Sequence, residues 1–264
     1  MSERGLSREL VGALREIARV SRLLVALDFD GTLAPEVDDP EQARAIPEAR
    51  AAVLALLALP NTRVALISGR SLKSLVKVAD LPDETLLVGS HGFEIRLDRA
   101  GEEPSLDTAQ IKQVGLLNEV LEEVADSFDQ VWLESKPAGF ALHTRMATEH
   151  NSRVAHLVAL SEATAEIENL KVRKGKDVLE FSVRNETKGD ALEHLRGYTN
   201  ASAVFYAGDD VTDEDAFSAL GPDDFGLKSG AGDTFAAHRV AGPLQVAQVL
   251  ALLAEYRDGT QHEQ

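Results

Sequence analysis

The sequence predicts an α/β fold in which a smaller α+β domain interrupts a core built on a parallel sheet. Apolar runs of strand length recur on both sides of the middle of the chain, and each ends in glycine or polar residues that open a helix. Such runs are typical of parallel strands buried on both faces. Between them the order changes to helix, hairpin, helix and hairpin, which is typical of an α+β domain. We therefore expect a core from residues 1–101 and 184–264 and an insert from residues 102–183.

Composition limits the partners and the kind of metal site. The 264 residues are 44% hydrophobic, enough to fill two cores, and the formal net charge of −17 argues against a nucleic-acid or anionic-membrane partner. The absence of cysteine excludes thiol ligands, and the seven histidines are scattered without metal-ligand spacing, so a bound metal would be a hard cation held by oxygen atoms. The sequence shows no signal peptide and no apolar run approaching the ~20 residues of a membrane span. We expect a cytoplasmic monomer.

The first elements lead to a pair of acids. Apolar residues at helical spacing predict a short helix between residues 6 and 20. The apolar run from Leu23 to Leu27 predicts a central strand that ends in Asp28 and Asp30. Because side chains alternate along a strand, both acids are expected on one side, at the strand end where α/β sheets bind ligands.

Two neighbouring carboxylates suit phosphoryl transfer. One can attack phosphorus while the other moves a proton, and a divalent cation would offset their mutual repulsion. The D-x-D pattern is short, however, and by itself it is equally compatible with an unrelated metal site or turn.

The second apolar strand also ends in polar residues. Residues 36–45 predict a loop, and Pro47 predicts the start of a helix. The strand from Val64 to Ile67 is followed by Ser68, Gly69 and Arg70. A glycine turn, a helix start and a hydroxyl can bind phosphoryl oxygens, although Ser68 could equally cap the next helix.

The third strand starts at Leu86 and ends in a loop that contains His91. This histidine either contacts a substrate or bonds to the loop backbone, and its position in a loop favours the second role.

The insert carries polar side chains in matching strand phase. Helices are expected near residues 111–124 and 152–164, each followed by a hairpin. On a solvent-facing sheet this alternation is ordinary. If the face binds a ligand instead, its acids and bases suit sugar hydroxyls, which both donate and accept hydrogen bonds. That polyol surface would consist of Glu134, Lys136, Arg145, Lys176 and Glu180.

The core pattern resumes at Lys188, which opens a helix. The next strand starts at Ala203 and leads into an acidic segment, residues 209–215, that includes Asp209 and Asp213. So many acids at one strand end would repel each other unless a cation or solvent compensated. A helix from Leu244 to Tyr256 is expected to complete the core.

Taken together, these motifs resemble a known family. The order DFDGT, Ser68, Lys188 and GDDVTD is similar to the haloacid dehalogenase phosphatases, whose Rossmann-like core carries a cap domain. Finer segments resemble signatures of the trehalose-6-phosphate phosphatases: DFDGTLAP, ISGR, SHGFE, ESK, HTR, GKDVLE and GDDVTDEDAF. The resemblance covers nearly the whole chain. One departure is Thr187, which precedes Lys188 where asparagine is frequent.

The resemblance implies a role for each site residue. Asp28 would be the nucleophile and Asp30 the general acid and base, while Ser68 and Lys188 would hold the phosphoryl oxygens. Mg²⁺ would be bound by Asp28, the backbone carbonyl of Asp30 and Asp209, with Asp213 bound directly or through water. The substrate would be a small sugar phosphate, contacted by Gly69, Arg70 and His91 and by the polyol surface of the insert.

Two alternatives stay open at this point. The first is another capped phosphatase that acts on sucrose phosphate, a mannosyl phosphate or a hexose phosphate, because the core motifs contact only the phosphate. The second is a non-catalytic sugar-phosphate sensor. The intact acids and Lys188 argue against a sensor, which needs neither a nucleophile nor a proton donor.

Overall fold

The computed structural model describes residues 3, 5–37, 39–97, 100–102, 106–175 and 177–261. The chain divides into two compact units: unit 1 is Met1–Glu103 with Glu186–Gln264, and unit 2 is Pro104–Asn185. The boundaries between the units lie after residues 103 and 185. The sequence predicts them after residues 101 and 183.

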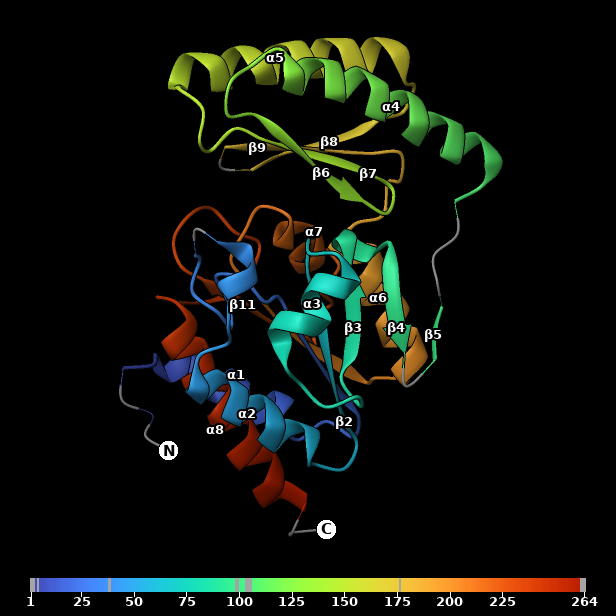
Figure 1. The fold of residues 1–264 in the computed structure, drawn as a ribbon. Helices are drawn as coiled ribbons and strands as arrows, with labels where there is room; N and C mark the ends of the chain where they lie inside the picture. The colour runs from blue at the N-terminus through green and yellow to red at the C-terminus, as the bar shows by residue number, and fades with distance from the viewer. Residues whose placement is uncertain are drawn as a thin grey trace. The chain divides into compact units, whose positions relative to one another are not determined.

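Unit 1 is built on a sheet that is mostly parallel (Figure 1). In spatial order its described strands are β12 (His238–Val240), β11 (Phe225–Ser229), β10 (Ala203–Gly208), β1 (Leu23–Leu27), β2 (Thr62–Ile67), β3 (Leu86–Gly89), β4 (Glu94–Leu97) and β5 (Ala100–Glu102). Pairing is parallel from β12 to β3, whereas β4 and β5 are antiparallel additions at the edge. The sequence does not predict these two strands, because they are short and carry charged or small residues.

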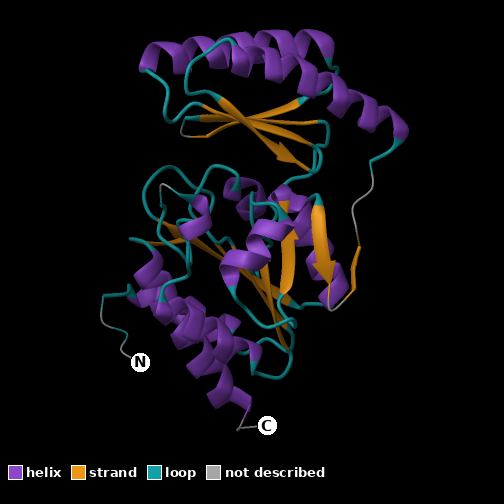
Figure 2. Cartoon of the chain, viewed as in Figure 1, coloured by secondary structure: helices purple, strands orange, loops and turns teal. Residues whose placement is uncertain are grey.

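Helices cover both faces of this sheet (Figure 2). One face packs against α1 (Arg8–Ile17), α2 (Pro47–Leu57), α3 (Leu72–Ala79) and α8 (Pro243–Gln261), and the other packs against α6 (Lys188–Thr199) and α7 (Asp213–Ser218). The side chains of β1 alternate between the two: Leu23, Val25 and Leu27 face the first set, while Leu24 and Ala26 face the second. Burial on both faces explains why this strand is a continuous apolar run.

Among the described residues, two short 3₁₀ helices lie in the connecting loops. They are η1 (Pro40–Gln42), inside the segment predicted as a loop, and η2 (Ser90–Gly92), directly after β3. No helix among the described residues combines the length and apolarity needed to span a membrane.

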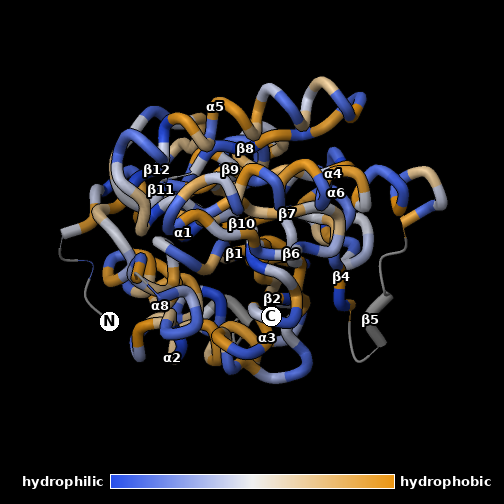
Figure 3. The backbone as a smooth tube through the Cα atoms, turned by 45° about the horizontal axis from the view of Figure 1, so that its top comes forward, coloured by the Kyte–Doolittle hydropathy of each residue, from blue (hydrophilic) through white to orange (hydrophobic). Residues whose placement is uncertain are grey.

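Unit 2 is an antiparallel sheet covered by two helices. Its described strands lie in the order β6 (Trp132–Lys136), β7 (Gly139–His143), β9 (Val178–Ser182) and β8 (Lys171–Gly175). Leu142 and Phe181 point toward α4 (Thr108–Asp126) and α5 (Glu149–Glu166), whose hydropathy alternates along the helix as amphipathic packing requires (Figure 3). The opposite face of the sheet carries the polar residues.

One predicted position on that face is wrong. Arg145 was expected on a strand beside His143, but β7 ends at His143 and Arg145 lies in an exposed turn. Thr144 follows the strand: its backbone N–H donates to the carbonyl of Asp177, and its buried hydroxyl contacts Ser152 Oγ at 2.7 Å.

The buried guanidinium of Arg257 joins α8 to the amino-terminal end of the sheet. Its side chain donates to Thr62 Oγ1 at 2.6 Å and to the carbonyl oxygens of Ala18, Val20 and Asn61. Arg257 is only 1% exposed, so these acceptors would not easily find water in its place.

We predict that Arg257→Ala lowers the free energy of unfolding by about 3 kcal/mol, because several buried acceptors lose their donor. Urea unfolding would measure the change. Arg8→Ala, which removes an exposed arginine from α1, is the control and should stay within about 0.5 kcal/mol. A loss below about 1 kcal/mol for Arg257→Ala would mean that water satisfies these acceptors.

Candidate active site

The carboxyl ends of β1 and β10 meet the start of α6 at one buried cluster. Lys188 Nζ donates to Asp28 Oδ1 at 2.8 Å and to Asp213 Oδ1 at 2.7 Å. The side chains of all three residues are almost completely buried. Thr187 caps α6 and thereby fixes the helix start that carries Lys188, and its hydroxyl accepts the N–H of Asp190.

Asp209 completes a group of three carboxylates. Asp28, Asp209 and Asp213 each offer an oxygen atom, and these atoms lie within 4.8 Å of one another. Gly31 makes this approach possible: its φ is +73°, and a Cβ there would lie 2.0 Å from Asp209 Oδ2. Glycine at this position therefore allows both the turn after β1 and the position of Asp209.

The two oxygens of Asp213 are fully engaged by protein groups. Oδ1 accepts from Lys188 and from the hydroxyl of Tyr206, and Oδ2 accepts the backbone N–H groups of Asp209 and Asp210. Asp213 thus shapes the loop that carries Asp209, and these bonds favour contact with a cation through water over direct ligation. The role of Tyr206 is not predicted from the sequence, although its place two residues before Gly208 on β10 marks the same strand end.

The electrostatics of the cluster favour a bound cation. Burial raises the pKa of Asp28 well above its usual range, and Asp213 and Asp209 add to the rise, while Lys188 opposes it. Burial and Asp213 likewise raise the pKa of Asp209 to about 6. Burial alone would lower the pKa of Lys188, but Asp213 and Asp28 outweigh it and raise that pKa. Three acids and one lysine leave excess negative charge that a divalent cation would neutralise.

Asp30 belongs to a different contact. β1 ends at Leu27, so Asp28 and Asp30 both follow the strand and do not share one of its sides as expected. The two side chains contact different partners: Asp28 contacts Lys188, and Asp30 contacts Arg70. Arg70 Nε donates to Asp30 Oδ2 and Arg70 Nη2 to Asp30 Oδ1, each at 2.6 Å. Arg70, expected at the substrate, is bound here to the predicted proton donor.

Ser68 lies buried at the carboxyl end of β2, and its Oγ accepts the N–H of Arg70 at 3.2 Å. It does not cap α3, because Ser71 does so by accepting the N–H of Ser74. The helix-cap alternative for Ser68 is therefore wrong. Its place in the strand next to β1 is compatible with the predicted contact to phosphate.

His91 holds the neighbouring loop. Its backbone lies in the left-handed region, with φ of +58°, and its N–H donates to the carbonyl of Ser68 at 3.0 Å. Its ring packs on Gly69, where a Cβ would lie 2.6 Å from Nε2. Glu94, which the sequence did not single out, accepts from Leu72 N–H and Ser90 Oγ in the same region.

In unit 2 the sheet brings together three of the predicted sugar-binding residues, Glu134, Lys136 and Glu180. Lys136 Nζ lies 3.2 Å from Glu134 Oε1 and 3.6 Å from Glu180 Oε1, and Glu134 Oε2 lies 2.9 Å from His143 Nε2. Trp132 stacks on His143 with ring centres 5.1 Å apart. Lys176 lies outside the described residues.

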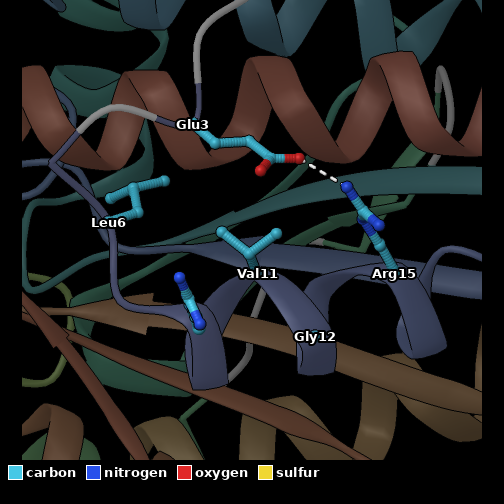
Figure 4. A pocket seen from close by; sticks show the side chains of 6 residues that line it. Glu3, Leu6, Val11, Gly12 and Arg15 are labelled. Atoms are coloured by element: carbon cyan, nitrogen blue, oxygen red, sulfur yellow. Dashed lines mark hydrogen bonds and ion pairs between the residues drawn. The ribbon is translucent and has the colours of Figure 1, made fainter.

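A separate pocket lies beside α1 and is lined by Glu3, Leu6, Arg8, Val11, Gly12 and Arg15 (Figure 4). Glu3 Oε1 and Arg15 Nη2 form an ion pair at 2.6 Å within it. None of the site residues predicted from the sequence lines this pocket. The candidate site is therefore the cluster of acids that follow β1 and β10.

A family model described as trehalose-phosphatase matches residues 26–248, which include all the acids of the cluster and Lys188. The chain belongs to the trehalose-phosphatase family. The trehalose-phosphate phosphatase of Mycobacterium ulcerans is 33% identical over 263 residues, which cover 93% of this chain and 66% of that protein. The probable trehalose-phosphate phosphatase 2 of Oryza sativa subsp. japonica is 31% identical over an alignment of 276 residues. This alignment covers 92% of this chain and 70% of that protein.

Solved structures agree on the fold of this trehalose-phosphatase family member. The C-terminal domain of the Candida albicans trehalose-6-phosphate phosphatase matches with a TM-score of 0.79 at 21% identity and covers 95% of this chain and 97% of that one. A haloacid dehalogenase-like hydrolase from Bacillus subtilis matches with a TM-score of 0.56 at 15% identity, and the match covers 86% of this chain and 98% of that one. The predicted α/β fold of haloacid dehalogenase type, with its parallel Rossmann-like sheet, is confirmed.

The site geometry makes Gly31 sensitive to substitution. We predict that Gly31→Ala destabilises unit 1 by about 2 kcal/mol and lowers phosphatase turnover, because the new Cβ overlaps Asp209 and the positive φ is strained. Thermal unfolding and phosphate release would measure both effects. Gly12→Ala is the matched control, since a Cβ there meets no atom within 4 Å and alanine favours the helix. Equal behaviour of the two variants would contradict the assignment of Gly31.

Proposed function

We propose that the chain is a Mg²⁺-dependent phosphatase that hydrolyses trehalose 6-phosphate to trehalose and phosphate. The observation that carries the proposal is the buried contact of Lys188 with Asp28, beside Asp209 and Asp213. The family match and the names of the relatives support trehalose 6-phosphate as the substrate.

The donor set fits a hard divalent cation. Every candidate ligand is an oxygen atom, and burial together with neighbouring carboxylates raises the pKa of both Asp28 and Asp209, which a bound cation would offset. Asp28, the carbonyl of Asp30 and Asp209 would hold Mg²⁺, with Asp213 positioning the loop. When bound, the ion would neutralise charge on the phosphoryl group and on the nucleophile.

The residues then divide the reaction into two steps. An oxygen of Asp28 attacks phosphorus, the bond from phosphorus to the sugar oxygen breaks, and Asp30 gives its proton to that oxygen. In the second step water attacks the aspartyl-phosphate and gives a proton to Asp30, and the bond to Asp28 breaks, which restores the carboxylate.

Lys188 and Ser68 would orient the phosphoryl group. Lys188 donates two hydrogen bonds to Asp28 and Asp213, and an ammonium group has a further N–H for a phosphoryl oxygen. Donors fixed in a buried site stabilise developing charge more strongly than donors in water.

The polar face of unit 2 supports a sugar substrate. Glu134, Lys136 and Glu180 form a connected set of acceptors and donors, which suits hydroxyl groups. Sugar contacts by Arg145 and Lys176, and by Gly69 and His91, stay predictions. So do a cytoplasmic location and a monomeric state.

The first test is substrate and metal dependence. We expect phosphate release from trehalose 6-phosphate at a higher kcat/KM than from sucrose 6-phosphate, mannosyl phosphates or hexose phosphates. EDTA should stop release and Mg²⁺ should restore it, because Asp28 and Asp209 would otherwise repel the phosphate. Asp28→Asn is the inactive control. A preference for another sugar phosphate would contradict the assignment of trehalose 6-phosphate as the substrate. Full activity after metal removal would contradict the proposed dependence on Mg²⁺.

The second test separates sugar from phosphate recognition. Glu180→Ala and Lys136→Ala should lower kcat/KM for trehalose 6-phosphate at least ~10-fold, about 1.4 kcal/mol, because the sugar hydroxyls lose a hydrogen-bond partner at a partly buried site. Hydrolysis of p-nitrophenyl phosphate should change little. Lys174→Ala, on an exposed part of the same sheet, is the control. Equal losses on both substrates would assign these residues to the stability of unit 2.

A further inference from the structure

We propose that Arg70 is a positioning residue that orients the carboxyl group of Asp30 for proton transfer and does not itself bind the phosphate. The inference rests on the proposed function, because it assigns a partner to the proton donor of that reaction.

The contact between the two side chains is bidentate. Arg70 Nε and Nη2 each donate to a different oxygen of Asp30, and both distances are 2.6 Å. A planar guanidinium matches a carboxylate in this geometry and fixes the plane of the carboxyl group, as a lysine could not. The Arg70 side chain is only 10% exposed, so water competes little for its donors.

Arg70 is itself held from other directions. Nη1 donates to the carbonyl of Pro40 at 2.8 Å and to Ser74 Oγ at 3.3 Å, and Cζ lies 5.8 Å from the centre of the Phe29 ring. Together with the two bonds to Asp30, these contacts occupy all but one of the N–H donors of a guanidinium. Binding phosphate oxygens in the usual two-pronged manner would require Arg70 to give up contacts already made.

Asp30 needs such a partner because it lies beyond the end of β1. Its backbone is held by a bridge to Ala34, but its side chain is 35% exposed and can rotate about its own bonds. Proton transfer requires an oxygen of Asp30 to meet the sugar oxygen at hydrogen-bond distance. When that oxygen carries the proton, its O–H donates to the sugar oxygen and it becomes a weaker acceptor for Arg70, while the other oxygen of Asp30 keeps its bond to the guanidinium.

The test is a double-mutant cycle with substrates that differ in leaving group. Arg70→Ala should lower kcat for trehalose 6-phosphate by about 10-fold or more. The loss should not exceed the ~10²- to 10⁴-fold contribution of the general acid itself. With p-nitrophenyl phosphate the first step should change much less, because nitrophenolate leaves without a proton. The inhibition constant of inorganic phosphate should stay within about 2-fold, and Arg70→Lys should recover little of the loss in kcat, because a lysine cannot fix the plane of the carboxyl group.

In an Asp30→Asn background, Arg70→Ala should cause no further loss, because a residue that acts through Asp30 has nothing left to orient. Arg50→Ala is the matched control: Arg50 pairs with Asp80 at 3.4 Å on the surface of unit 1 and should leave kcat unchanged. Thermal unfolding of every variant reports any loss of folded protein.

The results that overturn the inference are distinct. Weaker binding of inorganic phosphate by Arg70→Ala would make Arg70 a phosphate ligand, and additive losses in the double mutant would make its role structural. In both cases wild-type hydrolysis of sugar phosphate with Mg²⁺ would leave the proposed function intact. Wild type that hydrolyses no sugar phosphate would overturn both.

Discussion

The two ion pairs of Lys188 are the interaction on which the rest of unit 1 depends. A charged amine this deeply buried is stable only beside compensating charge, and Asp28 and Asp213 provide it. The three residues come from the end of β1, the start of α6 and the start of α7, which are far apart in the sequence. Their pairing therefore fixes the strand order around β1 and β10 and the path of the acidic loop at the same time.

Some parts of this arrangement follow from the sequence alone and others do not. The continuous apolar run before Asp28 predicts a strand buried on both faces, and Pro47 marks a helix start that the structure retains. The strands β4 and β5 are not predicted, because both are short and neither is a continuous apolar run. The site acids are predictable as residues that follow strand ends. Their partners are not, because side-chain contacts such as Arg70 with Asp30 depend on how separate loops fold together.

The predicted faces show the same limit. Alternation along β6 and β9 correctly places Glu134, Lys136 and Glu180 on one side of the sheet. It misplaces Arg145, because periodicity does not reveal that β7 stops at His143. Ser68 shows the same limit: it is a plausible cap in the sequence, and only the actual first turn of α3 shows that Ser71 is the cap.

The stack of Trp132 on His143 has a practical consequence. Trp132 is the only tryptophan of the chain, it is 42% exposed, and it lies on the same sheet face as Glu134 and Lys136. Indole emission depends on the polarity around the ring and is quenched by a protonated imidazole in contact with it. The tryptophan fluorescence of the unlabelled protein is therefore an optical signal from this one face of unit 2, separate from the proposed phosphate chemistry of unit 1.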